Sequence, residues 1–192
     1  MSDTTRGIGK VVVNRSMSLD GFIAGPGDAM DWIFDFVEPK APWMTEIAAQ
    51  TGAMLVGRRT DEVGDRMDAD NERGSASSDE GYPFSGRVFV LTHRPPEPPA
   101  PDVSYLSGDI GEAVATALAA AGGKDLEILG ADVAGQCLQR GLVDEIRVYV
   151  LPVLLGDGVR FYSSPGLARI DLEPVSSTRA DAVTILRFRV RK

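Results

Sequence analysis

The middle of the chain alternates helical and strand patterns, and this alternation limits the folds open to it. Apolar residues over 110–121 recur at helical spacing, with Asp109 able to cap the start and two glycines at the end. A short apolar strand is expected at 126–129, a second helix at about 132–140, and a strand at 145–151 in which apolar and polar residues alternate. Strands that alternate with helices predict a parallel α/β sheet.

The flanking segments extend this sheet. Apolar runs at 10–17, 53–56 and 88–92 have strand length, and the second run stops at Gly57 before a polar stretch that is expected to be helical. The runs at 170–177 and 182–190 are separated by a polar turn and predict an antiparallel hairpin. We therefore expect an α/β fold with a mixed, mostly parallel sheet, flanking helices and a C-terminal antiparallel hairpin at the sheet edge.

Three segments indicate loops. Residues 18–28 carry several turn formers and are expected to fold over a site. Residues 65–86 lack apolar periodicity, which indicates a long surface loop or a partly disordered segment, with a lid as the less favoured alternative. Residues 94–101 contain five prolines and predict an extended connector, because proline fits neither a helix interior nor a central strand.

Composition narrows the class of protein. With 192 residues, 43% of them hydrophobic and 25% charged, the chain is expected to form one domain over residues 10–192 behind a flexible tail at 1–9. The net charge of −8 disfavours binding to nucleic acid or to an anionic membrane. The single cysteine, Cys137, excludes an internal disulfide and multi-cysteine metal sites. No signal-peptide pattern begins the chain, so we expect a soluble cytoplasmic protein without a bound metal.

Two strand-to-helix junctions have the chemistry of phosphate sites. At 54–60 (MLVGRRT) a glycine precedes two arginines, and at 128–138 (ILGADVAGQCL) Gly130 and Ala131 are small enough for close backbone approach. A glycine at one such junction is more often a simple turn, but two junctions favour a dinucleotide. The GxGxxG and GxxxxGK[ST] motifs are absent, so we expect neither a Rossmann nor a P-loop binding mode.

Five segments in order, 18–32, 54–60, 90–94, 128–138 and 152–162, resemble motifs of the dihydrofolate-reductase-like superfamily. The closest variant is the reductase domain of bacterial bifunctional riboflavin-biosynthesis proteins. The resemblance implies an NADPH-dependent reductase that transfers hydride to a small heterocyclic, pterin-like or ribosylamino-pyrimidine-like substrate. The alternatives are a cofactor-binding or regulatory protein without turnover and, least favoured, a structural subunit. The segment at 152–162 and the edge hairpin suggest a homodimer.

The resemblance also assigns roles to individual residues. It implies that the cofactor phosphates are bound by Gly57, Arg58, Arg59 and Thr60. The adenosine ribose would lie beside Thr92, His93 and Arg94, and the pyrophosphate would be held by Gly130, Ala131, Asp132 and Val133. Ile23 and Ala24 would border the nicotinamide. Trp32 and Glu38 are expected near the substrate, and Asp20, Asp31 and Glu46 are the candidate catalytic carboxylates. For Asp20 a turn-capping role is equally favoured, while Trp32 and Trp43 are more typical of a core. His93 is expected to lie at the cofactor edge or on the surface.

The sequence departs from the family pattern at two places. Leu129 precedes Gly130 where a pair of glycines is usual, and an unusual peptide geometry such as a cis bond is still expected there. Position 41 is alanine, so the helix expected at 42–50 lacks the acid that grips the pterin in folate reductases, and folate is in doubt as the substrate. The proton is then expected from bound water, Asp31 or Asp20. The HxE and PCxxC motifs of the zinc deaminases are absent, which excludes a complete bifunctional enzyme.

Overall fold

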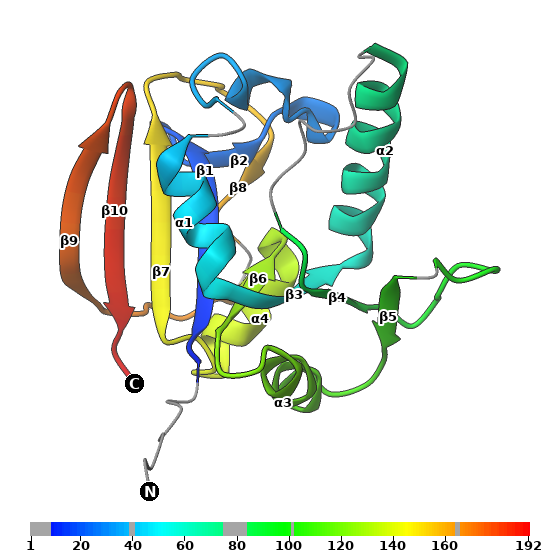
Figure 1. Cartoon of the computed structure of the whole chain (residues 1–192). Coiled ribbons are helices and arrows are strands. Elements are labelled where there is room, and N and C mark those ends of the chain that lie inside the picture. Colours follow the sequence, from blue (N-terminus) through cyan, green and yellow to red (C-terminus); the bar gives the residue numbers. More distant parts are fainter. Residues whose placement is uncertain (1–8, 39–40, 75–83, 101, 164–165) are drawn as a thin grey trace, which may run out of the picture.

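The computed structural model describes residues 9–38, 41–74, 84–100, 102–163 and 166–192. Within them an eight-stranded sheet has the order β5-β4-β3-β6-β1-β7-β10-β9 (Figure 1). The strands are β1 (Val11–Ser18), β3 (Thr51–Gly57), β4 (Arg87–Leu91), β5 (Val103–Leu106), β6 (Asp125–Leu129), β7 (Glu145–Leu151), β9 (Leu172–Ala180) and β10 (Val183–Val190).

The six strands from β5 to β7 pair in parallel, whereas β10 pairs antiparallel with both β7 and β9. The predicted mixed, mostly parallel sheet with a C-terminal antiparallel hairpin at its edge is therefore confirmed. A small second sheet joins β2 (Phe22–Ala24), inside the expected loop at 18–28, to β8 (Val159–Arg160).

Four α-helices flank the large sheet in the described residues, together with two short 3-10 helices. They are α1 (Pro42–Gln50), α2 (Arg58–Gly74), α3 (Ile110–Ala120), α4 (Ala131–Gln139), η1 (Pro26–Asp28) and η2 (Asp31–Ile33). As expected, Asp109 caps α3, where its carboxylate accepts hydrogen bonds from the backbone N–H groups of Gly111 and Glu112. No helix in the described part of the chain is long and apolar enough to cross a membrane.

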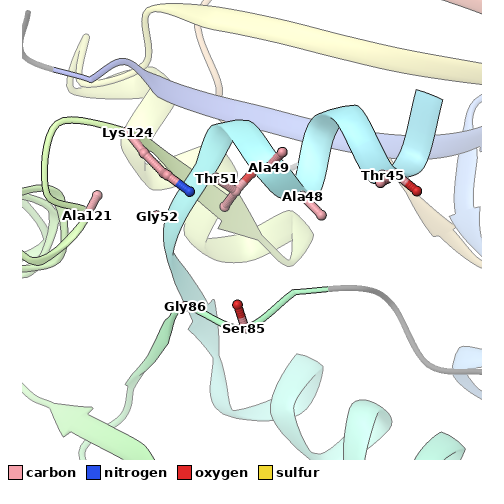
Figure 2. Close-up of a pocket in the computed structure, with 9 residues that line it drawn as sticks. All are labelled: Thr45, Ala48, Ala49, Thr51, Gly52, Ser85, Gly86, Ala121 and Lys124. Atoms are coloured by element: carbon pink, nitrogen blue, oxygen red, sulfur yellow. The ribbon is translucent and has the colours of Figure 1, made fainter. Parts of the chain in front are cut away.

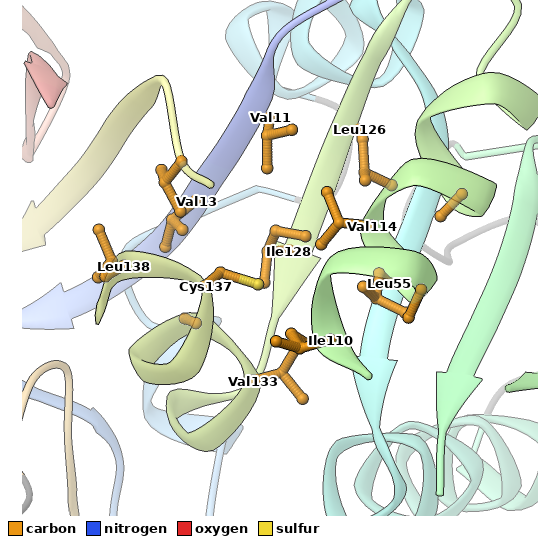
Figure 3. Packing of buried hydrophobic residues seen from close by; sticks show 14 of the residues in the cluster. Val11, Val13, Leu55, Ile110, Val114, Leu126, Ile128, Val133, Cys137 and Leu138 are labelled. Carbon is orange, nitrogen blue, oxygen red and sulfur yellow. The ribbon is translucent and has the colours of Figure 1, made fainter. Parts of the chain in front are cut away.

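The main core lies between α3, α4 and one face of the central strands (Figure 3). Val13, Leu55 and Ile128 on the sheet are fully buried against side chains of the two helices, among them Cys137. On the opposite face, Trp43 of α1 stacks on Tyr149 of β7 with ring centroids 4.6 Å apart. Alternate residues of each central strand are therefore buried on opposite faces, as expected of a sheet covered on both sides.

One expected loop begins as a helix. The segment 65–86, expected to be a loop, is helical as far as Gly74, and residues 75–83 lie outside the described part. This polar helix lacks an apolar stripe but gains support from pairs such as Arg58–Glu62, whose atoms are 2.7 Å apart. The connector expected at 94–101 has neither helix nor strand in its described residues, and the sequence analysis missed β5, the four-residue edge strand that follows it. The expected tail falls on residues that are not described, apart from Gly9.

Candidate functional site

The carboxyl ends of the parallel strands meet at one edge of the sheet. From β3 the chain continues outward to β4, whereas from β6 it crosses over β1 to β7, in the opposite direction along the sheet. Because crossovers between parallel strands are right-handed, α2 and α4 lie on opposite faces. The direction of winding reverses between β3 and β6, and open α/β sheets bind ligands in the crevice at such a point.

The two glycine junctions predicted from the sequence meet in this crevice. Gly130 is the N-cap of α4 and has φ 93°, a left-handed conformation that favours glycine. A Cβ atom on Gly130 would lie 2.5 Å from Oγ1 of Thr60 and 3.9 Å from the backbone N of Gly57. A Cβ atom on Gly57 would lie 3.1 Å from Cγ2 of Val133. The N-termini of α2 and α4 therefore approach so closely that no side chain fits between them at Gly130.

The expected cis bond at this junction was wrong. The peptide between Leu129 and Gly130 is trans, and in the described residues only the Glu97–Pro98 bond is cis. Leu129 packs in an apolar cluster with Met54 and Val56 on the sheet. The positive φ of Gly130 supplies the sharp turn that the sequence had suggested would need an unusual peptide.

Three arginines of α2, at positions 58, 59 and 66, form ion pairs with nearby carboxylates. Arg58 lies at the first position of α2 and pairs with Glu62, and both side chains are more than half exposed. Nε of Arg59 lies 2.8 Å from Oδ2 of Asp28, and Nη2 of Arg66 lies 3.8 Å from the same oxygen. The hydrogen bond to Asp28 raises the pKa of Arg59. The loop after β2 is thereby tied to the start of α2.

The three residues after β4 form a turn beside this crevice. Leu91 pairs in register with Gly57, so Thr92 follows β4 next to the start of α2. Thr92 is buried, its N–H donates to the carbonyl of Leu106 at 2.8 Å, and its Oγ1 accepts from the N–H of Arg94 at 3.0 Å. His93 and Arg94 are exposed. The turn thus presents two cationic or polar side chains to solvent at the next strand end.

Asp20 is held as a carboxylate between two loops. It accepts hydrogen bonds from Oγ of Ser18 at 2.6 Å and from the N–H groups of Leu155 at 3.1 Å and Gly156 at 2.8 Å. These bonds, that of Ser18 foremost, lower the pKa of Asp20 to about 2. At neutral pH the group is ionised, and its contacts favour the turn-capping role over that of a proton donor.

The other residues expected near the substrate lie apart from one another. Ile23 and Ala24 are buried in β2, and Nε1 of Trp32 donates to the carbonyl of Ala29 at 3.2 Å while its ring packs with the apolar cluster under α1. Asp31, Glu38 and Glu46 are exposed, and Oε1 of Glu46 accepts from Nε2 of Gln50 at 3.3 Å. These three carboxylates are exposed to solvent, which is not typical of an acid–base site.

A buried polar cluster was missed by the sequence interpretation. It consists of Asn14, Arg15, Thr51, Glu127 and Tyr149. The Tyr149 hydroxyl donates to Oδ1 of Asn14 at 3.3 Å, and Oγ1 of Thr51 donates to Oε2 of Glu127 at 3.4 Å. The available signal was one charged residue inside each of two apolar strand runs, VVVNR and LEIL.

The charges of this cluster are incompletely paired. Arg15, 8% exposed, donates through Nη1 to the carbonyl of Asn14, while its Nη2 has no partner in the described structure. Burial lowers the pKa of Arg15 to about 10, and burial raises the pKa of Glu127 although the charge of Arg15 partly offsets it. The parallel pairing of β1 with β6 ends at Val13 and Ile128, two residues before Arg15. The cluster therefore holds a buried positive charge whose carboxylate neighbour is Glu127.

A hollow of about 380 Å³ lies at the other edge of the sheet, at the amino end of β3 (Figure 2). It is lined by Thr45, Ala48, Ala49, Thr51, Gly52, Ser85, Gly86, Ala121 and Lys124. None of the residues predicted to bind cofactor or substrate lines it. No group of three or more His, Cys, Asp or Glu side chains suited to a metal occurs among the described residues.

Comparisons with known proteins agree with this geometry. The sequence matches the family model of the RibD C-terminal domain over residues 9–186. No curated protein matches it. A protein assigned to riboflavin biosynthesis from Shewanella sp. PV-4 has a similar structure, with a TM-score of 0.74 and 23% identity over 95% of this chain and 99% of that chain.

Two further solved structures extend the comparison. The diaminohydroxyphosphoribosylaminopyrimidine deaminase/5-amino-6-(5-phosphoribosylamino)uracil reductase of Thermotoga maritima has a TM-score of 0.62 at 19% identity, covering 95% of this chain and 57% of that chain. Dihydrofolate reductase from Enterococcus faecalis, complexed with NADP(H), has a TM-score of 0.58 at 15% identity, covering 97% and 99%. Identities this low show a shared fold, which is that of dihydrofolate reductase. The family model matches nearly the whole length of this chain, residues 9–186. The chain therefore belongs to the RibD C-terminal domain family.

Proposed function

We propose that the protein is an NADPH-dependent reductase whose cofactor binds in the crevice between β3 and β6. The close approach of Gly57, Thr60 and Gly130 carries this proposal, because it brings two helix N-termini together with only small residues at the two junctions. Free N–H groups and the positive ends of both helix dipoles would then face one ligand. These features fit the pyrophosphate of a dinucleotide.

Each part of the cofactor has candidate partners around this crevice. Its phosphates would be held by Gly57, Arg58, Arg59 and Thr60, and its pyrophosphate by Gly130, Ala131, Asp132 and Val133. Thr92, His93 and Arg94 would lie beside the adenosine ribose. Ile23 and Ala24 would lie beside the nicotinamide. Bound NADPH would supply the hydride, and the protein would supply orientation. Arg58 and Arg94 follow neighbouring strand ends and would favour NADPH over NADH by binding the additional phosphate.

The substrate we propose is a small heterocycle of the pterin or ribosylamino-pyrimidine class. The names of the similar solved structures support this class. In the segment after β2, we propose that Trp32 and Glu38 contact the substrate. Because Asp20 is ionised at neutral pH, we propose that the proton comes from bound water or from Asp31, with Glu46 as the remaining alternative.

A second candidate function is cofactor binding without turnover. It is favoured by one observation: Asp31, Glu38 and Glu46 face solvent, and α1 carries no acid at its first turn, where Ala41 is the N-cap.

We also propose a cytoplasmic homodimer. Exposed apolar side chains support a contact through the loop after β7 and the edge strand β9, where Leu154, Leu172 and Val175 are exposed.

Calorimetric titration with NADPH tests the cofactor proposal, and Gly130→Ala is the informative variant. A methyl group at Gly130 would collide with Thr60, so NADPH binding should weaken strongly. Gly141→Ala is the matched control, since Gly141 also has a positive φ of 64° but has nothing within 4 Å of its added Cβ. A wild-type protein that shows no binding heat and no thermal stabilisation with NADPH would contradict the proposal. Turnover with NADPH and a reducible pyrimidine or pterin then separates the reductase from the binding protein.

A further inference from the structure

Asp28 places a negative charge against one of the arginines proposed to receive cofactor phosphate. Its carboxylate is 14% exposed and lies 2.8 Å from Nε of Arg59 and 3.8 Å from Nη2 of Arg66. Arg59 itself is 72% exposed and follows Gly57 by two residues, in the first turn of α2. The arginine is therefore accessible to a ligand but already neutralised by an internal anion.

The loop that carries Asp28 has a demanding conformation. Gly27 and Asp28 both have left-handed backbones, with φ of 69° and 65°, and the N–H of Gly25 donates to the carbonyl of Ala29 at 2.8 Å. A left-handed backbone is uncommon for a residue with a side chain, although aspartate and asparagine tolerate it best. The ion pair with Arg59 ties this turn to α2, 31 residues later in the sequence.

An incoming phosphate must contend with this carboxylate. Nε of Arg59 already donates to Asp28, and two anions that share one guanidinium repel each other. We infer that Asp28 competes with the cofactor phosphates for Arg59, so that it lowers cofactor affinity and its release from α2 accompanies binding. This inference rests on the proposed function, since it requires a phosphate-bearing ligand in the crevice.

The strength of the competition follows from the exposure of the pair. Ion pairs at the surface are worth about 0.2–1 kcal/mol, which corresponds to a change in Kd of roughly 1.5-fold to fivefold. Asp28 therefore tunes affinity and does not block the site. A ligand with several phosphate charges can displace it, whereas one with a single weak anionic group gains little.

The test is calorimetric titration of the wild type and of Asp28→Asn with NADPH. Asparagine keeps the size of the side chain and tolerates the left-handed backbone, so the fold should persist. We expect the Kd of Asp28→Asn to be roughly 1.5-fold to fivefold lower than that of the wild type. Asp171→Asn is the matched control, because Asp171 forms an exposed ion pair with Arg169 at 2.7 Å before the edge strand β9. Its Kd should equal that of the wild type.

Salt dependence provides a second measurement that a purely structural role would not change. In Asp28→Asn, Arg59 meets the ligand unpaired, so log Kd should rise more steeply with the logarithm of salt concentration than in the wild type. Inorganic pyrophosphate as the probe should show the same difference. Equal or weaker NADPH binding by Asp28→Asn would overturn the inference and leave the proposed function standing. If neither protein binds NADPH or pyrophosphate, both are wrong.

Discussion

Glu145 accepts a 2.6 Å hydrogen bond from Nε of Arg147, two residues along the same strand, and both side chains are buried. Oε2 of Glu145 also accepts from Lys10 at 2.9 Å, and its Oε1 accepts from Arg187 on β10. Burial alone would raise the pKa of this carboxyl, but the hydrogen bonds from Arg147, Lys10 and Arg187 outweigh it and lower the pKa to about 2. One carboxylate thus joins the parallel part of the sheet to its antiparallel hairpin.

Replacing this carboxylate should destabilise the fold. Glu145→Gln leaves the buried guanidinium of Arg147 with a weaker partner, and we expect a loss of about 3 kcal/mol in the free energy of unfolding at pH 7. The folded pKa lies below that of the unfolded chain, so the contribution is complete above the unfolded value and is lost as the pH falls toward 2. Urea unfolding between pH 7 and 3 should therefore show a smaller pH dependence in the variant. Glu173→Gln, which removes an exposed partner of Arg189, should match the wild type.

Glu127 should have the opposite dependence on pH. Burial raises its pKa, so the folded state disfavours the ionised carboxylate, and stability should decline as the pH rises from the unfolded pKa through the folded one. Glu127→Gln should remove this decline and keep the hydrogen bond from Thr51. The measurement is the melting temperature at pH 5 and pH 8 for both proteins. A wild type that becomes more stable over this interval, with the variant unchanged, would contradict the argument.

Cofactor preference should depend on Arg58 and Arg94. Charge-assisted hydrogen bonds contribute about 1.5–3 kcal/mol, so the loss of either arginine should weaken NADPH binding by roughly tenfold to a hundredfold and leave NADH almost unaffected. Arg58 must exchange Glu62 for the phosphate, which places its effect toward the lower end. Calorimetric titration of Arg58→Ala and Arg94→Ala with both cofactors measures the contrast. Equal affinity of the wild type for NADH and NADPH would refute the assignment.

The core between the sheet and helices α3 and α4 should be sensitive to truncation. Leu55 is fully buried on β3, and Leu55→Ala should cost about 2–5 kcal/mol, because the lost methyl groups leave a cavity. The control is Leu19→Ala, which removes the same atoms from a side chain that is 67% exposed. That change should stay within about 0.5 kcal/mol. Urea midpoints for the three proteins at one pH decide the matter.

The sequence predicted elements whose signals are local. Helix α1 was expected at 42–50 from the family resemblance, and it is found there with Pro42 in its first turn. The strand run ending at Gly57 and the capped helix α3 were likewise confirmed. Helix α2 was cut short because its apolar spacing is weak and its support comes from charged pairs, which periodicity does not measure.

Long-range pairing was beyond the same reasoning. Neither the insertion of β6 between β3 and β1 nor the contact of Asp28 with Arg59 leaves a periodic trace, since each depends on how separate segments meet. The approach of Gly57 to Gly130 was suggested by the two glycine junctions, which favoured one dinucleotide. The buried Arg15 and Glu127 were overlooked, because single charges in apolar runs were interpreted as ordinary strand positions.

The placement of α2 and α4 on opposite faces of the sheet gives the crevice a mechanical consequence. A ligand that contacts Gly57 and Gly130 together would fasten the two outer layers of the molecule through the sheet that separates them. Any molecule that binds the folded chain alone shifts the balance away from the unfolded chain in proportion to its occupancy. Proteolysis proceeds through opened states, so the lifetime of this protein in a cell would follow the local supply of its cofactor.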